Sequence, residues 1–205
     1  MLGKIAGLFF ISFLAAAQQN HFGNSLIDVT VLGRSDALWT LTSRQSHNSY
    51  AFSPPVFEID GTLHAAALRN VRENPKRSQI GNQIEEYRFS GSLADDPDLS
   101  IDLIYRIAFE SPVVRFRYVL RCSGSRALTR FGERNRLQYL KTSFATLPRV
   151  TEIRLSEFNQ IVHSYTASER VVSDGSFSDG LQTIGPIVIG EDLAGNTLLI
   201  ACEHG

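Results

Sequence analysis

The sequence predicts an all-β protein folded as an antiparallel β-sandwich. Apolar and polar residues alternate with a period of two over several segments, as in strands that bury one face. Turn residues recur between these segments about every ten positions, a spacing typical of sandwiches. Thirteen Phe, six Tyr and fifteen Gly also favour pleated surfaces and tight turns over helices. No segment shows a sustained helical period.

The N-terminus, residues 1–17, is predicted to be a signal peptide that precedes the sandwich, residues 18–205. Lys4 gives a positive start, Ile5 to Leu14 form an apolar core, and three alanines end at Ala17, where we expect cleavage. The apolar run is short for a membrane span of about 20 residues. A retained anchor is the alternative. We expect a secreted or exported protein, extracellular or periplasmic, without a membrane partner.

The first strands are expected as two hairpins. Residues 26–32 and 37–43 flank a turn that begins at Gly33, and Pro54-Pro55 breaks the following connection. Residues 56–59 and 62–64 flank Asp60-Gly61, a dipeptide that favours a tight reversal. Residues 73–81 and 123–136 are polar or basic and are predicted to be loops, and further strands are expected near residues 171, 183–189 and 196–202.

The clearest alternation lies in residues 99–121, where two strands are joined by Glu110-Ser111-Pro112. Alternate residues are expected to face inward or outward. The inward set is Leu99, Ile101, Leu103, Tyr105, Ile107, Phe109, Val114, Phe116, Tyr118 and Leu120, and the outward set is Ser100, Asp102, Arg106, Glu110, Arg115, Arg117 and Arg121.

Three strings around these strands resemble the N-terminal supersandwich-like domain of glycoside hydrolase family 36, the α-galactosidases: Tyr87–Gly91, Asp95–Leu99 and Ser111–Tyr118. The similarity extends over about residues 37–205. It includes Trp39–Leu41, Asn48–Phe52, Gly61–His64, 151–155, 179–181 and 203–205. One departure is Ala65 to Leu68, where the family usually has an aromatic pair and a glycine near the sugar site.

The resemblance implies a non-catalytic role for this chain. Family members use two aspartates in a (β/α)₈ barrel that follows the sandwich, and such a barrel needs about 250 residues. The family nucleophile lies in a Lys-x-Asp motif, whereas Lys4, Lys76 and Lys141 are followed two positions later by Ala6, Ser78 and Ser143. Whether the chain is an enzyme by itself is left open. We expect a C-terminally truncated domain with no catalytic, cofactor or metal residue.

The implied partners are the catalytic barrel of the parent enzyme, a galactoside bound through the parent site, and other subunits of a homo-oligomer. A free-standing carbohydrate-binding module is the alternative, and a secreted structural protein is a third interpretation. Twenty basic and twenty-one acidic residues remove the electrostatic case for a nucleic-acid partner.

Several groups of polar residues are candidate sites. Asp95, Asp96 and Asp98 lack the register of a calcium loop, and glycosidase carboxylates face each other about 5–10 Å apart, so a solvated turn is favoured. Arg88, Arg106, Arg115, Arg117 and Arg121 form a basic face that suits an acidic ligand or glycan, but ion pairs with Asp102 and Glu110 are favoured.

The remaining candidates also have simpler interpretations. The histidines, at positions 21, 47, 64, 163 and 204, lack zinc spacing. Cys122 and Cys202 form either one disulfide or, by default, buried free thiols. Trp39, Tyr50, Phe52 and Phe57 suit a sugar platform or the core, and the core is favoured.

Overall fold

The computed structural model describes residues 20–65, 67–73, 78–81, 83–129, 138–143, 149–155, 167–173 and 186–202. Every regular element in these ranges is a strand, and every strand pair is antiparallel. The predicted all-β fold is therefore confirmed. No helix in the described part is long and apolar enough to cross a membrane. The predicted signal peptide, residues 1–17, lies outside the described residues.

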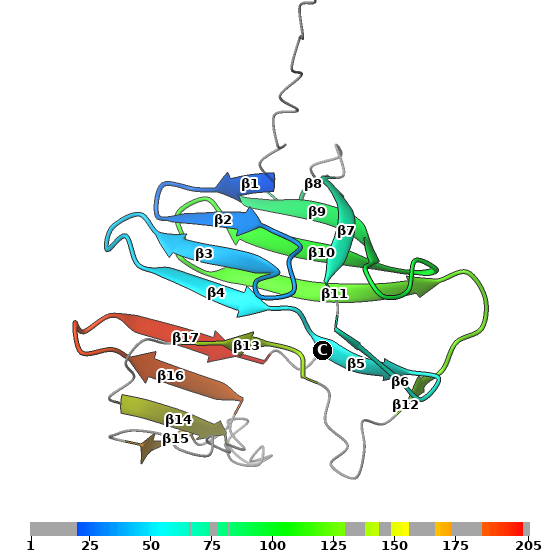
Figure 1. Cartoon of the computed structure of the whole chain (residues 1–205). Coiled ribbons are helices and arrows are strands. Elements are labelled where there is room, and N and C mark those ends of the chain that lie inside the picture. The colour runs from blue at the N-terminus through cyan, green and yellow to red at the C-terminus, as the bar shows by residue number, and fades with distance from the viewer. Residues whose placement is uncertain are drawn as a thin grey trace, which may run out of the picture.

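The first sheet has the order β1-β2-β3-β4-β13 (Figure 1). The turn between β2 and β3 begins at Gly33, as expected. The Pro54-Pro55 break also lies where predicted, directly after β4. The strands are β1 (Asn20–Gly23), β2 (Ile27–Val31), β3 (Trp39–Ser43), β4 (Ser49–Ser53) and β13 (Lys141–Thr142).

The second sheet has the order β11-β10-β9-β7, and the short strand β8 pairs with β9. The turn that holds Asp95, Asp96 and Asp98, called the aspartate turn below, joins β9 to β10, and the turn at Ser111-Pro112 joins β10 to β11. Both turns lie where the sequence predicts them. The strands are β7 (Leu68–Glu73), β8 (Ser78–Gln79), β9 (Ile84–Leu93), β10 (Leu99–Ala108) and β11 (Val114–Cys122).

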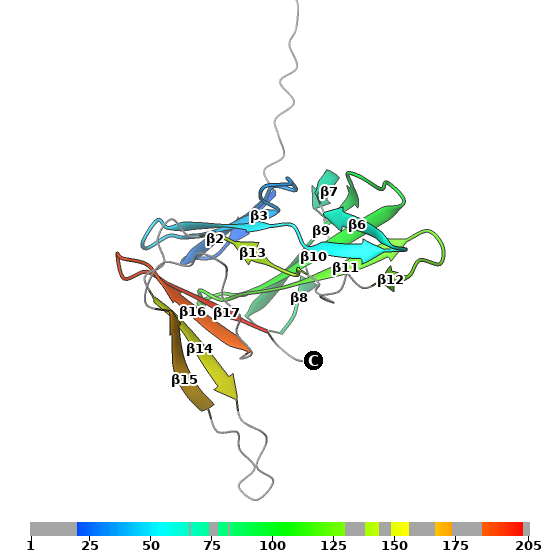
Figure 2. The ribbon, with the colours of Figure 1, turned by 60° about the horizontal axis from the view of Figure 1, so that its bottom comes forward.

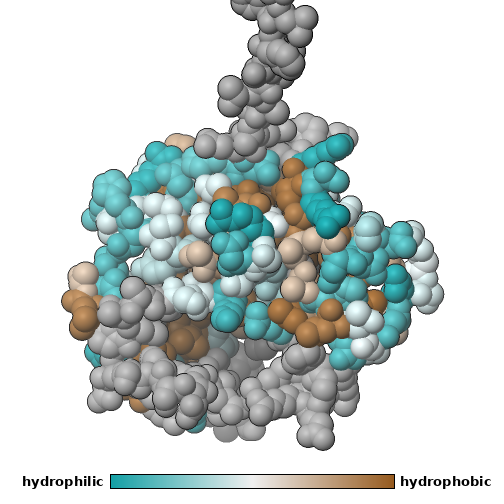
Figure 3. Space-filling view, viewed as in Figure 1, coloured by the Kyte–Doolittle hydropathy of each residue, from teal (hydrophilic) through white to brown (hydrophobic). Residues whose placement is uncertain are grey.

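The core lies between these two sheets, which makes the arrangement a β-sandwich. The Phe22 ring of β1 stacks on Tyr87 of β9 with the ring centroids 4.2 Å apart. Trp39 of β3 meets Tyr105 of β10 edge to face at 5.5 Å. Burial of these large rings between the sheets is the main stabilising contribution. Figure 3 shows that the surface over β1–β4 is mostly hydrophilic or neutral, with smaller hydrophobic areas.

Two smaller sheets complete the described chain. One has the order β12-β5-β6 and the other the order β15-β14-β16-β17. Figures 1 and 2 place β17 nearest to the sandwich and β15 farthest from it. Leu198 of β17 belongs to the main core, and Ile200 packs against it. The strands are β5 (Val56–Ile59), β6 (Thr62–Ala65), β12 (Leu128–Thr129), β14 (Arg149–Leu155), β15 (Ala167–Ser173), β16 (Ile187–Glu191) and β17 (Thr197–Ala201).

Most of the predicted inward residues are inside, but Phe109 is not. Leu99, Ile101, Leu103, Tyr105 and Ile107 are all buried. Phe109 is 69% exposed, because β10 ends at Ala108 and the turn carries the next residue out of the alternation. The prediction for Phe109 was wrong. At the other predicted reversal, Asp60 and Gly61 have positive φ values of 51° and 78°, as a tight hairpin requires.

Candidate functional site: the aspartate turn and Arg126

The aspartate turn between β9 and β10 is held first by its own backbone. The amide of Leu99 donates to the carbonyl of Asp96 at 3.1 Å, and the amide of Asp98 donates to the Asp96 carboxylate at 3.1 Å. An aspartate that accepts from the backbone two residues later is a standard turn device. The predicted turn is confirmed, but it is more than a solvated one.

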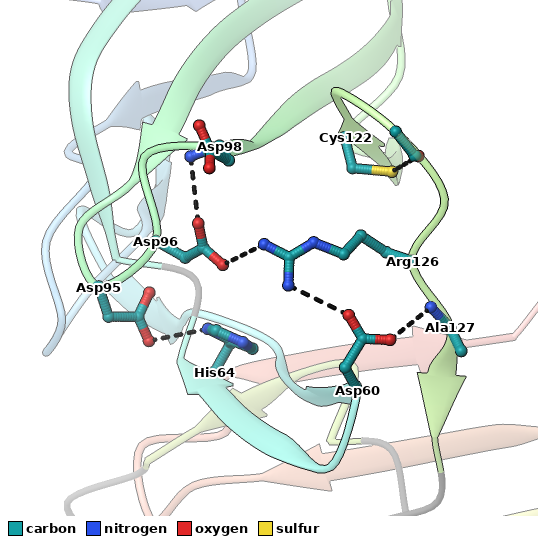
Figure 4. A network of polar contacts seen from close by, with 9 residues as sticks. Asp60, His64, Asp95, Asp96, Asp98, Cys122, Arg126 and Ala127 are labelled. Carbon is teal, nitrogen blue, oxygen red and sulfur yellow. Dashed lines mark hydrogen bonds and ion pairs between the residues drawn. The ribbon is translucent and has the colours of Figure 1, made fainter.

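Arg126 connects this turn to the β5-β6 hairpin (Figure 4). One terminal nitrogen contacts Asp96 at 3.1 Å and the other contacts Asp60 at 3.1 Å. Asp60 also accepts from the amide of Ala127 at 2.9 Å. The hydrogen bonds from Ala127 and Arg126 lower the pKa of Asp60. The hydrogen bond to Asp60 and the nearby charge of Asp96 in turn raise the pKa of Arg126. The guanidinium of Arg126 therefore joins its own loop to the aspartate turn and to the β5-β6 hairpin, three segments that are distant in sequence.

His64 of β6 joins the other side of this cluster. Its Nδ1 lies 3.2 Å from a carboxylate oxygen of Asp95, and the ring is buried beside Phe57. A histidine held by a carboxylate can act as a general base when a nucleophile lies next to it. Among the described residues, no hydroxyl or thiol hydrogen-bonds to His64. Cys122 instead contacts the carbonyl of Gly124 at 3.0 Å.

The geometry does not suit metal binding or glycoside hydrolysis. Asp95 and Asp96 point to different partners, His64 and Arg126 (Figure 4). Within the ranges that the structure describes, no group of three His, Cys, Asp or Glu side chains could hold a metal ion. The cluster instead ties three turns together, an arrangement that suits a structural clamp.

Arginines on the outer face of β9–β11 form ion pairs, but one of the carboxylate partners differs from the prediction. Arg121 contacts Asp102 at 2.7 Å, as expected, whereas Arg106 contacts Glu86 at 2.8 Å. Glu110 was predicted to be an ion-pair partner on an adjacent strand. It lies in the turn after β10, so that expectation was wrong, and Glu86 of the neighbouring strand β9 pairs instead.

Both carboxylates on this face are nearly inaccessible to solvent. Burial raises the pKa of Glu86, but Arg106 and Arg88 outweigh it and the net pKa is lowered. Asp102 behaves in the same way, with Arg121 and the Ser90 hydroxyl as the stabilising partners. The carboxylates of Glu86 and Asp102 therefore stay ionised beside the arginine side chains that contact them.

The other sequence candidates are mostly structural. Trp39, Phe52 and Phe57 are each 2% exposed, which confirms the core assignment, and Tyr50 packs against the same core. His21 contacts Asp28 at 3.0 Å, and His47 lies in the connection between β3 and β4. His163 and His204 fall outside the described residues.

The cysteine expectation needs correction. Cys122 and Cys202 are both free, and both are exposed. The default expectation of buried thiols was wrong, because each cysteine lies at the end of its strand or just beyond it, past the residues that face the core.

Two hollows that sequence reasoning missed lie at one end of the sandwich. The larger, of about 500 Å³, lies beside the exposed ring of Phe109 and is lined by Gly23, Asn24, Gln83, Glu85, Ile107 and Ala108 as well. Asn24 stabilises this end, since its side-chain amide donates to the carbonyls of Ala108 and Ser111 at 2.8 Å each. The second hollow adjoins Ala108 and includes Arg106 and Arg115. Both hollows depend on segments that are far apart in sequence.

Comparison with protein-family models, with curated proteins and with solved structures gave no match.

Proposed function

We propose that the chain is the N-terminal, non-catalytic domain of an exported α-galactosidase-like glycoside hydrolase of family 36. In this role the sandwich supports the barrel active site and contributes to subunit contacts during carbohydrate breakdown. The observation that carries the proposal is the place of the resembling strings. Tyr87–Gly91, Asp95–Leu99 and Ser111–Tyr118 lie on β9, β10, β11 and their two connecting turns, and thus form one continuous meander.

Exposed apolar side chains support a scaffolding role. Leu63 of β6, Leu128 of β12 and Leu199 of β17 are 47%, 63% and 56% exposed. They lie on the two smaller sheets, outside the main sandwich. Single exposed leucines are ordinary, but leucines on two accessory sheets supply apolar surface that a neighbouring domain can cover.

The ionisation and pairing of the aspartates around Arg126 also support a non-catalytic role. A glycosidase general acid needs a carboxyl group whose pKa is raised so that it holds a proton. The pKa of Asp60 is instead lowered by its partners, and Asp96 is ion-paired to the same guanidinium. These carboxylates are suited to hold Arg126 rather than to protonate a leaving group.

The decisive experiment is to read the DNA downstream of the Gly205 codon. The proposal expects an open frame that continues into a barrel with a Lys-x-Asp motif, and an in-frame stop would contradict it. In a second assay, the purified chain should not hydrolyse an aryl α-galactoside. Turnover that disappears in Asp96→Asn, but persists in the matched exposed variant Asp36→Asn, would also contradict the proposal.

A further inference from the structure

The larger of the two hollows lies at one end of the sandwich and is lined by both main sheets. Gly23 and Asn24 come from the end of β1 and the residue after it, and Ile107 comes from β10. Ile107 is buried, so the hollow reaches from the surface to the edge of the core. Its volume of about 500 Å³ lies within the range of small-ligand sites, about 300–1,000 Å³.

The exposed ring of Phe109 lines this hollow from a backbone that is firmly held. The amide of Phe109 donates to the carbonyl of Gln83 at 2.9 Å. The Asn24 side chain fixes the neighbouring carbonyls of Ala108 and Ser111 at 2.8 Å each. A ring presented on a fixed backbone loses little further freedom when a ligand binds. Its π face carries partial negative charge, which attracts the C–H groups of a ligand.

Two exposed polar side chains, Glu85 and Gln83, line the same hollow. The hydroxyl of Tyr87, a buried residue, donates to the Glu85 carboxylate and orients it. A carboxylate has about four acceptor sites, so this one bond leaves others for a ligand. The side-chain amide of Gln83 supplies both donors and an acceptor. Together these groups match ligand hydroxyls, which donate and accept at the same atom.

From these observations we propose that the hollow binds a neutral saccharide, with the C–H face of a sugar ring on Phe109 and its hydroxyls on Glu85 and Gln83. Glu85 is the only charged residue among the described lining residues, so an anion finds no opposite charge there. An apolar ligand would remove water from the carboxylate without replacing its hydrogen bonds. A simple cation would use Glu85 but not the amide of Gln83. This inference does not depend on the proposed family membership.

The test is NMR titration of the purified full chain with three neutral disaccharides: melibiose, maltose and cellobiose. Sorbitol, which carries hydroxyls but no ring, is the control. We expect at least one disaccharide to bind with a Kd of about 10 mM or tighter and to shift the amide resonances of Gln83 and Phe109, and sorbitol to shift neither. No shift with any disaccharide, or equal shifts with sorbitol, would overturn the proposal. Tighter binding of tetramethylammonium than of every disaccharide would overturn the choice of a neutral ligand.

Variants at the exposed ring locate the site. Phe109→Leu keeps an apolar side chain but removes the ring, and should weaken binding of the best disaccharide about fivefold or more. Phe109→Tyr keeps the ring and should leave the affinity within about twofold. The control Leu193→Ala truncates a side chain that is 77% exposed, in the connection between β16 and β17, and should also stay within about twofold. Thermal melts check that all three variants fold. Equal affinities of Phe109→Leu and Phe109→Tyr would exclude stacking on this ring.

Discussion

The indole Nε1 of Trp39 donates to the hydroxyl of Tyr118 at 3.2 Å. This hydrogen bond links β3 of the first sheet to β11 of the second, across the sandwich interior. Trp39 is buried, so its single donor needs a partner inside the protein. Burial also raises the pKa of Tyr118, although the hydrogen bond from Trp39 opposes this rise.

Tyr118→Phe should lower the free energy of unfolding by about 1–2 kcal/mol, because the indole donor would lose its acceptor. Tyr105→Phe is the matched control. The Tyr105 hydroxyl is buried and has no hydrogen-bond partner among the described residues, so its removal should be neutral or stabilising. Urea melts followed by tryptophan fluorescence measure both changes, and equal losses would contradict the assigned bond.

Phe116→Ala should destabilise the protein more than the neighbouring change Arg117→Ala. The Phe116 ring is half-buried and packs against Trp39 and Tyr139, with ring centroids 5.1 and 5.8 Å apart. We expect a loss of about 2 kcal/mol, below that for a fully buried Phe. The exposed Arg117 should cost less than about 0.5 kcal/mol. Similar urea midpoints for the two variants would show that the faces of β11 are wrongly assigned.

Arg126→Gln should loosen three turns without unfolding the protein. The exposed ion pairs to Asp60 and Asp96 add little to global stability in water, but they hold the hairpin and the aspartate turn together. Amide hydrogen exchange should become several-fold faster at Ala127 and around Asp98. Arg34→Gln, which removes an ion pair within one turn, should leave these amides unchanged. Unchanged exchange in Arg126→Gln would exclude the clamp.

Acid should destabilise the protein partly through Asp102. Its folded-state pKa is lowered, so the unfolded chain takes up this proton more readily. The stabilising contribution is complete above the unfolded pKa of about 4 and disappears as the pH falls through the lower folded value. Asp102→Asn should therefore flatten the loss of stability below about pH 5. Arg121→Gln should act in the same direction, and an unchanged slope in both variants would contradict the assignment.

Much of the sandwich was predictable because apolar and polar residues alternate along its strands and recognisable turn residues separate them. Strands end where the local residues favour a turn, as at Pro54-Pro55, at Asp60-Gly61 and at the two turns beside β10. The division into four sheets was not predictable. The pairings of β5 with β12 and of β4 with β13 join distant segments, and local patterning holds no information about such partners.

The polar sites were only partly predictable for the same reason. Asp102 was recognised as a partner of the basic face because it lies on an alternating strand. Glu86 was missed as its second partner because register, rather than composition, places it opposite Arg106. Arg126 lay inside a predicted loop, and no local signal indicates that its guanidinium reaches two turns.

The pairing order of the strands has a consequence for folding. Within β1–β4 and within β9–β11, every hydrogen-bonded neighbour is also the neighbour in sequence, so these ladders close short loops at little entropic cost. The Trp39–Tyr118 contact lies between the two main layers, and apart from β13 and Leu198 of β17 these layers are contained in the first 122 residues. We therefore expect a nascent chain to assemble most of its core before β12–β17 are synthesised. Those later strands would then add to a surface that is already formed.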